Sequence, residues 1–221
     1  MNNYLLLLLT SCILALTACQ SENETKVETT EYVHIPPSLP ENIYEKLEPG
    51  DCIIRKGNGP LSYHLMNSTK EDYSHGGIII QEAGKWKVIH TIGGSSSSDE
   101  IDGIQVIDLR EFVAHAADSM LYICRPIFKD SAGHQVAEQA RFYLDEQIPF
   151  DHGFSMFSED KWYCTELLYY IFKDVNGKNV FDIKKKHKSY MLMFSTFFKE
   201  EYFKPLFHLK PNKEDWYVLK E

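Results

Sequence analysis

The sequence predicts one α+β domain in which an antiparallel sheet packs against a helix that begins at Cys164. Two observations predict this fold. Two β-rich runs joined by a short glycine-containing turn indicate a hairpin over residues 76–90. After Cys164, apolar side chains recur at helical spacing and share a face with the thiol. The length of 221 residues and the 43% hydrophobic content suit one domain with short unstructured ends.

The N-terminus has the pattern of a lipoprotein signal peptide. Residues 4–18 are almost wholly apolar, are short for a bilayer span, and end in small residues. The ending Leu16-Thr17-Ala18-Cys19 resembles a lipobox, in which the cysteine takes the lipid before cleavage. No Lys or Arg precedes the apolar run, so an uncleaved N-terminal anchor is the alternative. We therefore expect a signal peptide over 1–18, a lipid anchor at Cys19, and an exported chain held to a membrane of the bacterial cell envelope.

Composition predicts the rest of the organisation. Residues 19–40 are polar and acidic, then Pro-rich, which is typical of a flexible tether, and the folded domain is expected over 41–221. Gln20 and the acidic residues after it favour the outer membrane or the cell surface over the inner membrane. The net charge of −9 disfavours nucleic acid as a partner, because a polyanion is repelled. The basic run 184–188 predicts a solvated loop.

The predicted elements follow from residue 52 onward. Strands are expected at 52–55, 76–80, 86–90, 104–107, 120–124 and 216–219, with helices at 61–66, at 109–117, from Asp130 or Ser131 to before Pro149, and from Cys164. Pairing about the hairpin turn places His75 and His90 at the same open end, on neighbouring strands.

Cys164 differs from the other four cysteines of the chain. Cys12 would leave with the signal peptide and Cys19 would carry lipid, while Cys52 and Cys124 lie in apolar strand-like runs where cysteine is usually a small core residue. Three remaining cysteines in an oxidising compartment leave at least one free thiol. At the first turn of a helix, Cys164 faces the positive end of the helix dipole, so we expect its thiolate to be favoured.

The two histidines are candidates to act with this thiol. An imidazole at the end of the sheet can take the thiol proton, and a second polar group can hold that ring in one orientation. The backbone N–H of Cys164 can donate to the oxyanion of a tetrahedral intermediate. Spacing alone leaves two alternatives open, namely core packing of all three side chains and a zinc site made by Cys164, His75 and His90.

Three sequence blocks together resemble the YiiX/YaeF-like permuted papain-like amidases of the NlpC peptidase superfamily. The blocks are Gly50-Asp51-Cys52-Ile53-Ile54-Arg55, Tyr73-Ser74-His75-Gly76-Gly77-Ile78 and Tyr163-Cys164-Thr165-Glu166-Leu167. Histidine precedes cysteine in this family, the reverse of papain. The resemblance covers about residues 47–174 and implies a circularly permuted papain-like (NlpC-type) fold. It also implies that Cys164 is the nucleophile, that His75 is the base, and that a polar residue of the second hairpin strand orients the base.

Two positions depart from the family pattern. His90 stands where YiiX-like proteins typically have Glu, although the lecithin retinol acyltransferase group and many NlpC peptidases have His there. Tyr163 stands where murein peptidases place an Asp that binds a substrate amine, whereas Ser74, the partner in that recognition, is kept. Ser74 and Tyr163 are therefore the candidate substrate-binding residues. The departure at Tyr163 favours another amide, or a lipid ester, over a stem peptide with a free amine.

We expect a cell-envelope cysteine hydrolase that forms a thioester on Cys164 and acts as an amidase or peptidase. Its partner would be an amide- or ester-containing substrate, such as a peptide, amino-acid or lipid conjugate. One alternative is a lipid acyltransferase or esterase, which His90 and the apolar segment 191–198 favour, and another is a lipoprotein that binds without turnover. No metal or other cofactor is expected. Glu166 is expected to cap the helix, and Asp151 and Phe154 are candidates to line the cleft.

Overall fold

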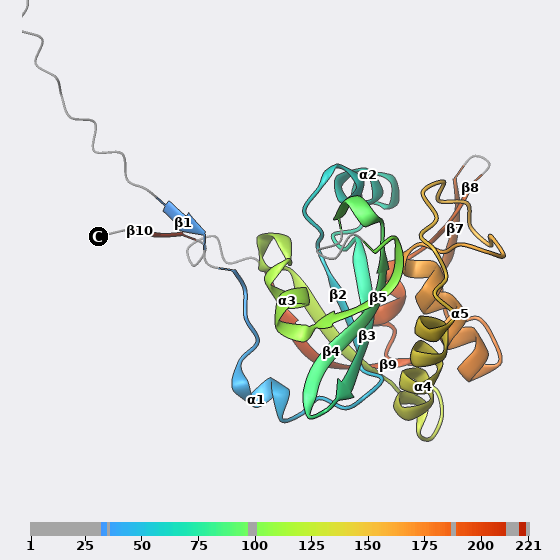
Figure 1. Ribbon diagram of the computed structural model, residues 1–221, viewed down its shortest axis with the longest axis horizontal. Coiled ribbons are helices and arrows are strands. Elements are labelled where there is room, and N and C mark those ends of the chain that lie inside the picture. The colour runs from blue at the N-terminus through green and yellow to red at the C-terminus, as the bar shows by residue number, and fades with distance from the viewer. Residues whose placement is uncertain (1–31, 35, 97–100, 187–188, 211–216, 220–221) are drawn as a thin grey trace, which may run out of the picture. The chain divides into compact units, whose positions relative to one another are not determined.

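The computed structural model describes residues 32–34, 36–96, 101–186, 189–210 and 217–219 (Figure 1). The predicted signal peptide, Cys12 and Cys19 lie outside these residues. The helices are α1 (Glu41–Tyr44), α2 (Pro60–Thr69), α3 (Leu109–Ala114), α4 (Ala132–Asp145) and α5 (Cys164–Asn176), with short 3-10 helices at Gly94–Ser96, Ala117–Ser119 and Phe194–Phe198. The strands are β1 (Tyr32–His34), β2 (Cys52–Arg55), β3 (His75–Glu82), β4 (Lys85–Ile92), β5 (Gly103–Asp108), β6 (Leu121–Pro126), β7 (Ile183–Lys186), β8 (Ser189–Leu192), β9 (Phe203–Leu209) and β10 (Tyr217–Leu219).

The chain divides into two units. Residues 33–218 form the larger unit, and the smaller one, residues 1–32 with 219–221, lies mostly outside the described part of the chain. No helix among the described residues has the length and apolar character needed to cross a bilayer.

An antiparallel sheet of six strands forms the centre of the larger unit. Its order is β5-β4-β3-β2-β6-β9, and every neighbouring pair is antiparallel. The predicted hairpin is the pair β3–β4, in which Glu82 lies opposite Lys85. Ala83 and Gly84 connect the two strands, and their φ angles are 47° and 78°. A two-residue turn with positive φ at both residues matches the right-handed twist of paired strands, so this turn favours the hairpin. The prediction of an antiparallel sheet packed on a helix is confirmed.

Helices cover both faces of this sheet. Figure 1 shows α3 on one side and α4 with α5 on the other. Successive strand residues alternate between the two faces, so Ile78 and Ile80 pack in the core under α4 and α5, whereas Ile79 packs in the core with Phe112 of α3. Each of these isoleucine side chains is essentially fully buried, which contributes roughly 1.5–3 kcal/mol to folding per side chain.

Helix α5 has defined start and stop signals. It begins after Tyr163, whose backbone is extended, and Glu166 closes a capping box on the first turn. It ends at Gly177, whose φ of 75° is the left-handed conformation that favours glycine. Between these ends the side chains of Leu167, Leu168, Ile171 and Phe172 are fully buried. The helix is therefore held by its packing against the sheet.

Gly76 sets how closely α5 approaches the sheet. A Cβ atom at Gly76 would lie 3.0 Å from Cγ2 of Ile54 on β2 and 3.2 Å from Cδ1 of Leu168 on α5. Glycine removes that atom, so the first turn of α5 lies directly against the start of β3.

The structure departs from the sequence prediction near both ends of the domain. Leu39, which was predicted to lie in the tether, is buried with Ile43 of α1, because apolar side chains there reach the core. No strand was predicted between residues 175 and 215, yet β7, β8 and β9 lie there. Pro205 lowers the strand signal of β9, and β9 is an edge strand, the position where a sheet tolerates proline. The predicted solvated loop 184–188 begins within β7.

We predict that Gly77→Ala destabilises the domain by about 1–3 kcal/mol. A Cβ atom there would lie 2.5 Å from Cγ1 of Val88 and 2.6 Å from the backbone oxygen of Ile89, so β4 must shift. Urea unfolding followed by circular dichroism measures the change. The control is Gly59→Ser, because nothing lies within 4 Å of a Cβ at Gly59 and serine suits the start of α2. Equal stability of the two variants would contradict the packing described.

Candidate active site

The Cys164 thiol lies at the contact between α5 and β3. Cys164 is the first residue of α5 and is 5% exposed. Its thiol donates a 3.7 Å hydrogen bond to the backbone oxygen of Ser74. Three backbone N–H groups also interact with the sulfur and favour its negatively charged form, namely those of Thr165, Gly76 and Cys164 itself. The sulfur is therefore surrounded by amides that stabilise negative charge, as expected for the start of a helix.

The two histidines form a buried pair. His75 is the first residue of β3, and its Nε2 lies 2.9 Å from Nδ1 of His90 on β4. The ring of Phe112 stacks on His75 at a centroid distance of 5.5 Å and meets His90 edge-on at 5.6 Å. Gly77 lies beside His90, where a Cβ would be 3.1 Å from the Cβ of His90. The hairpin thus brings together the two histidines that the sequence singled out.

Cys164 and His75 line the same cavity, which has a volume of about 500 Å³. Within the described residues, no hydrogen bond joins the Cys164 sulfur to the His75 ring. Since His90 engages Nε2 of His75, Nδ1 is the ring nitrogen left to take a thiol proton. Catalytic hydrogen bonds of ligand-free enzymes are often long and tighten when substrate binds. The structure thus places the thiol and the His75 ring on the wall of one cavity.

The family described as "Permuted papain-like amidase enzyme, YaeF/YiiX, C92 family" matches residues 46–197. The chain belongs to the C92 family. The family is described as one of papain-like amidases, and the resemblance drawn from the three sequence blocks is confirmed. The predicted α+β papain-like fold is also confirmed.

Two relatives extend this comparison. The uncharacterized protein YiiX of Escherichia coli (strain K12) is 25% identical over 139 residues, which are 62% of this chain and 62% of YiiX. This C92 chain therefore matches less than two thirds of the length of that relative. A crystal structure described as metalloprotein yiiX from Escherichia coli O157:H7 has a TM-score of 0.62 at 18% identity, covering 74% of this chain and 98% of the other. This structural similarity shows that the two proteins share a fold.

The zinc alternative does not fit the side chains of this C92 chain. Among the described residues, no group of three or more His, Cys, Asp and Glu side chains is arranged to hold a metal ion. The facing nitrogens of His75 and His90 lie at hydrogen-bond distance from each other instead of converging on a common point. The crystal structure named above is described as a metalloprotein, and that description concerns the other protein.

Burial decides the charge state of the thiol and the two rings. Burial raises the pKa of Cys164 to about 12, although the amides of Thr165 and Gly76 lower it. Burial, assisted by the nearby Arg55 charge, holds the pKa of His75 well below its usual range and lowers that of His90 to about 3. The expectation of a favoured thiolate is therefore wrong for the resting protein, because the loss of hydration outweighs the amides and the helix dipole. The Cys164 thiol and the His75 ring are therefore both in their neutral forms at neutral pH.

Sequence reasoning missed Arg55, the last residue of β2. Arg55 lies opposite His75 in the β2–β3 register and is 6% exposed. Its guanidinium lies 4.6 Å from the ring centroid of Phe112, and its buried Nε has no hydrogen-bond partner. Burial lowers the pKa of Arg55 to about 10, which leaves it charged at neutral pH, while interaction with Cys164 opposes that shift. The available signal was a charged residue that ends an apolar strand.

Ser74 and Tyr163 have structural roles next to the thiol. The Ser74 hydroxyl accepts a 2.9 Å hydrogen bond from the backbone N–H of Gly57, so it fixes the chain that leaves β2. Tyr163 precedes α5 and is buried, and it lines a second cavity of about 400 Å³ that Cys164 also lines. Both residues therefore lie at the site, and only Tyr163 lines this second cavity.

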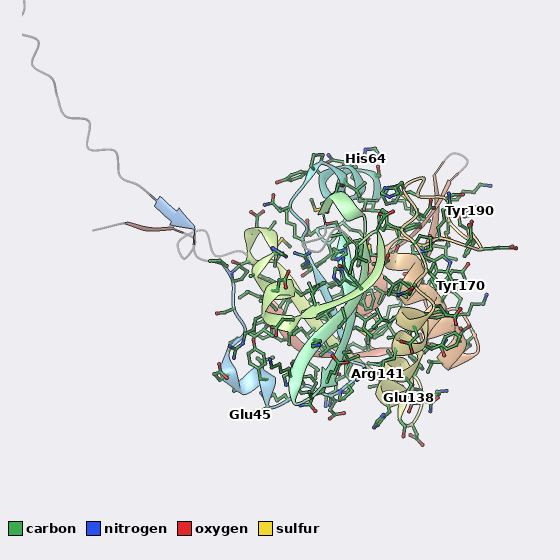
Figure 2. The ribbon with its side chains drawn as sticks, viewed as in Figure 1. Glu45, His64, Glu138, Arg141, Tyr170 and Tyr190 are labelled. Atoms are coloured by element: carbon green, nitrogen blue, oxygen red, sulfur yellow. The ribbon has the colours of Figure 1, made fainter. Side chains whose placement is uncertain are left out.

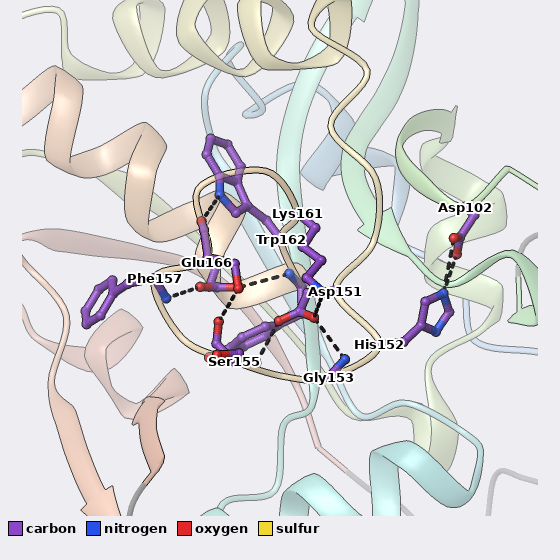
Figure 3. A network of polar contacts seen from close by, with 11 residues as sticks. Asp102, Asp151, His152, Gly153, Ser155, Phe157, Lys161, Trp162 and Glu166 are labelled. Carbon is purple, nitrogen blue, oxygen red and sulfur yellow. Dashed lines mark hydrogen bonds and ion pairs between the residues drawn. The ribbon is translucent and has the colours of Figure 1, made fainter.

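Two buried carboxylates hold the loop that leads into α5 (Figure 3). Glu166 accepts hydrogen bonds from the backbone N–H groups of Phe157 at 2.6 Å and Tyr163 at 3.3 Å, which confirms its predicted capping role. Asp151 is fully buried, accepts from the N–H groups of Gly153 at 2.9 Å and Ser155 at 2.6 Å, and does not line either cavity. The candidate role of Asp151 in the cleft is therefore wrong, whereas Phe154 lines both cavities.

We predict that iodoacetamide alkylates Cys164 slowly at pH 7 and about tenfold faster with each pH unit up to pH 10. The thiolate reacts, and its fraction rises tenfold per unit while the pH stays below the raised pKa. Mass spectrometry of the peptide that contains Cys164 measures the rate constant, and Cys164→Ala provides the blank. A rate constant that is flat from pH 6 to 9 would show a thiolate already formed and would contradict the neutral pair.

Proposed function

We propose that this chain is a cell-envelope cysteine amidase that forms a thioester on Cys164. The observation that carries the proposal is the placement of the Cys164 sulfur at the start of α5, among backbone amides and in one cavity with His75. Membership of the C92 family of permuted papain-like amidases supports it. The thiol is the nucleophile in this proposal, because it has amide donors beside it and shares a cavity with a base.

His75 is the proton carrier in this proposal. Its Nδ1 takes the thiol proton while the sulfur attacks the acyl carbon, and the N–H of Cys164 donates to the developing oxyanion. The imidazolium then gives the proton to the departing nitrogen, the acyl–nitrogen bond breaks, and the thioester remains. Water, with its proton taken by the same ring, releases the acid and restores the thiol. Because both partners rest neutral, the proton moves during attack on the substrate and not before it.

His90 acts as a positioning residue. If Nδ1 of His75 accepts a proton, the ring hydrogen lies on Nε2 and is donated to Nδ1 of His90 at 2.9 Å. The hydrogen of His90 then lies on its Nε2, which is buried and has no partner. An unpaired buried N–H costs about 1–3 kcal/mol. This arrangement holds His75 in the tautomer that carries its hydrogen on Nε2, although one N–H group of His90 is left without a partner.

An envelope location follows from the N-terminal sequence in this proposal. The lipobox-like ending Leu16-Thr17-Ala18-Cys19 places the lipid on Cys19, and residues 20–38 then separate the membrane from the domain. Export through a lipoprotein pathway, with the outer membrane or the cell surface as destination, brings the site to envelope substrates.

A lipid esterase or acyltransferase is the second candidate. The observation that favours it is the second cavity beside Cys164, which is lined mostly by apolar side chains and has a volume of about 400 Å³. The acyl-enzyme chemistry is the same, and only the leaving atom changes from nitrogen to oxygen.

We predict that Cys164→Ala and His75→Ala each lower kcat/KM on octanoyl 4-nitroanilide by at least about 10³-fold, since each removes a reacting group. His90→Ala, which removes only the positioning group, should cost on the order of ten- to a hundredfold. Release of 4-nitroaniline measures turnover, and circular dichroism monitors the fold. Cys124→Ala is the matched control, because Cys124 is an equally buried free thiol on β6. The same loss in Cys124→Ala would indicate a structural effect and contradict the assignment.

We predict that Cys19→Ser blocks both lipidation and processing. Growth with labelled palmitate followed by immunoprecipitation measures the lipid, and the electrophoretic size of the chain reports cleavage. Cys12→Ser is the control, because Cys12 lies inside the apolar run and should leave both events intact. Incorporation of label into the Cys19→Ser chain would overturn the lipid anchor.

A further inference from the structure

Two cavities of different character meet at Cys164. The apolar cavity has a volume of about 400 Å³ and lies between α2 and β8, with Leu65, Tyr73, Phe154, Met191 and Phe194 among its walls. Figure 2 shows His64 on α2 and Tyr190 on β8, which also line it. The other cavity, called the polar cavity because its walls carry more polar groups, has a volume of about 500 Å³, and Arg55, Ser74, His75, Thr91, His115 and His152 are among its walls beside apolar side chains. Cys164 lines both cavities.

The position of His75 indicates which cavity binds the acyl group of the substrate and which binds the leaving group. The residue that protonates a leaving group must lie within hydrogen-bond reach of the leaving atom. His75 lines the polar cavity and does not line the apolar cavity. The leaving group therefore occupies the polar cavity, and the acyl group extends from the sulfur into the apolar cavity.

Arg55 brings a buried positive charge to the wall of the polar cavity. Two side chains with permanent charge line this cavity within the described structure, Arg55 and Asp118. Asp118 forms an ion pair with Lys56, and the charge of Glu111 acts on Arg55, raising the pKa of Arg55 against the effect of burial. The guanidinium is buried, and its Nε lacks a hydrogen-bond partner. A buried guanidinium with an unused donor is suited to bind a carboxylate or a phosphate.

We propose that the substrate joins an apolar acyl chain to a leaving group that carries a carboxylate or a phosphate, and that Arg55 binds this anion. The proposal rests on the proposed function, because Cys164 must first form the acyl-enzyme. In that step the sulfur–acyl bond forms, the bond to the leaving nitrogen or oxygen breaks, and the thiol proton passes through His75 to the leaving atom. Taking about 30 Å³ for each group of the size of water, the apolar cavity of about 400 Å³ holds roughly 13 carbon-sized groups.

Matched pairs of substrates test the anion. N-octanoylglycine is compared with N-octanoylglycinamide, and octanoylglycerol 3-phosphate with octanoylglycerol, in the parent, Arg55→Met and Arg55→Lys. We expect the parent to prefer the anionic member of at least one pair, and the preferred pair identifies the anion as carboxylate or phosphate. Arg55→Met should lower kcat/KM for that member by at least about 30-fold and change its neutral partner much less, because only the anion loses its counter-charge. Arg55→Lys should restore part of the preference.

Two results overturn the role of Arg55. One is a parent enzyme that shows no preference in either pair. The other is an equal decrease of kcat/KM on anionic and neutral substrates in Arg55→Met. That result would indicate that Arg55 stabilises the negative charge of the sulfur or of the oxyanion instead of binding the leaving group. The comparison within one variant separates recognition from misfolding, since a folding defect lowers both members of a pair alike.

Chain length tests the apolar cavity. With 4-nitrophenyl esters from acetate to hexadecanoate, we expect kcat/KM to peak at about 12 carbons, since the cavity holds roughly that many carbon-sized groups. Met191→Trp, which fills the apolar cavity from β8, should move the peak to shorter chains. Lys184→Trp is the control, because Lys184 is exposed on the paired strand β7 and lines neither cavity.

The outcomes for the inference and for the proposed function are distinguishable. A Cys164-dependent burst of 4-nitrophenolate without any chain-length preference would overturn the acyl assignment and leave the cysteine hydrolase in place. A burst of the same size in Cys164→Ala would contradict both the acyl assignment and the proposed function.

Discussion

The site depends on one close contact, that between the first turn of α5 and the start of β3. Gly76 permits it, because a side chain there would meet both Ile54 and Leu168. The contact brings the Cys164 sulfur to the backbone oxygen of Ser74 and the amide of Gly76, next to His75 in the chain. The residues proposed as nucleophile and base therefore come from elements that are far apart in sequence, and the buried face of α5 holds Cys164 in place.

The same burial sets the electrostatics of the site. Taking the thiol and the rings out of water favours their neutral forms by more than the local amides favour the thiolate. Arg55 adds to this effect, since its charge disfavours a second cation at His75. A substrate that brings an anion to Arg55 would weaken that repulsion and allow the imidazolium to form. In the proposed mechanism, substrate binding and proton transfer would thereby be linked through Arg55.

Much of this site could be predicted from sequence because local patterns encode it. The short glycine turn sets the register of β3 and β4, and that register leads to the contact between His75 and His90. The apolar spacing after Cys164 gave the helix and its buried face. The protonation of the thiol and the burial of Arg55 could not be predicted, because both depend on what packs around them in three dimensions. Strand β9 was missed because Pro205 weakens its local signal while pairing with β6 stabilises it.

The central claim is that Cys164 carries the acyl group during turnover. Acid quenching of a reaction with 4-nitrophenyl octanoate, followed by intact mass measurement and peptide mapping, tests this claim most directly. The account predicts one octanoyl group per chain, located on Cys164, released by neutral hydroxylamine, and missing from Cys164→Ala. Turnover that leaves Cys164 unmodified, or an octanoyl group on another residue of the active protein, would contradict the account.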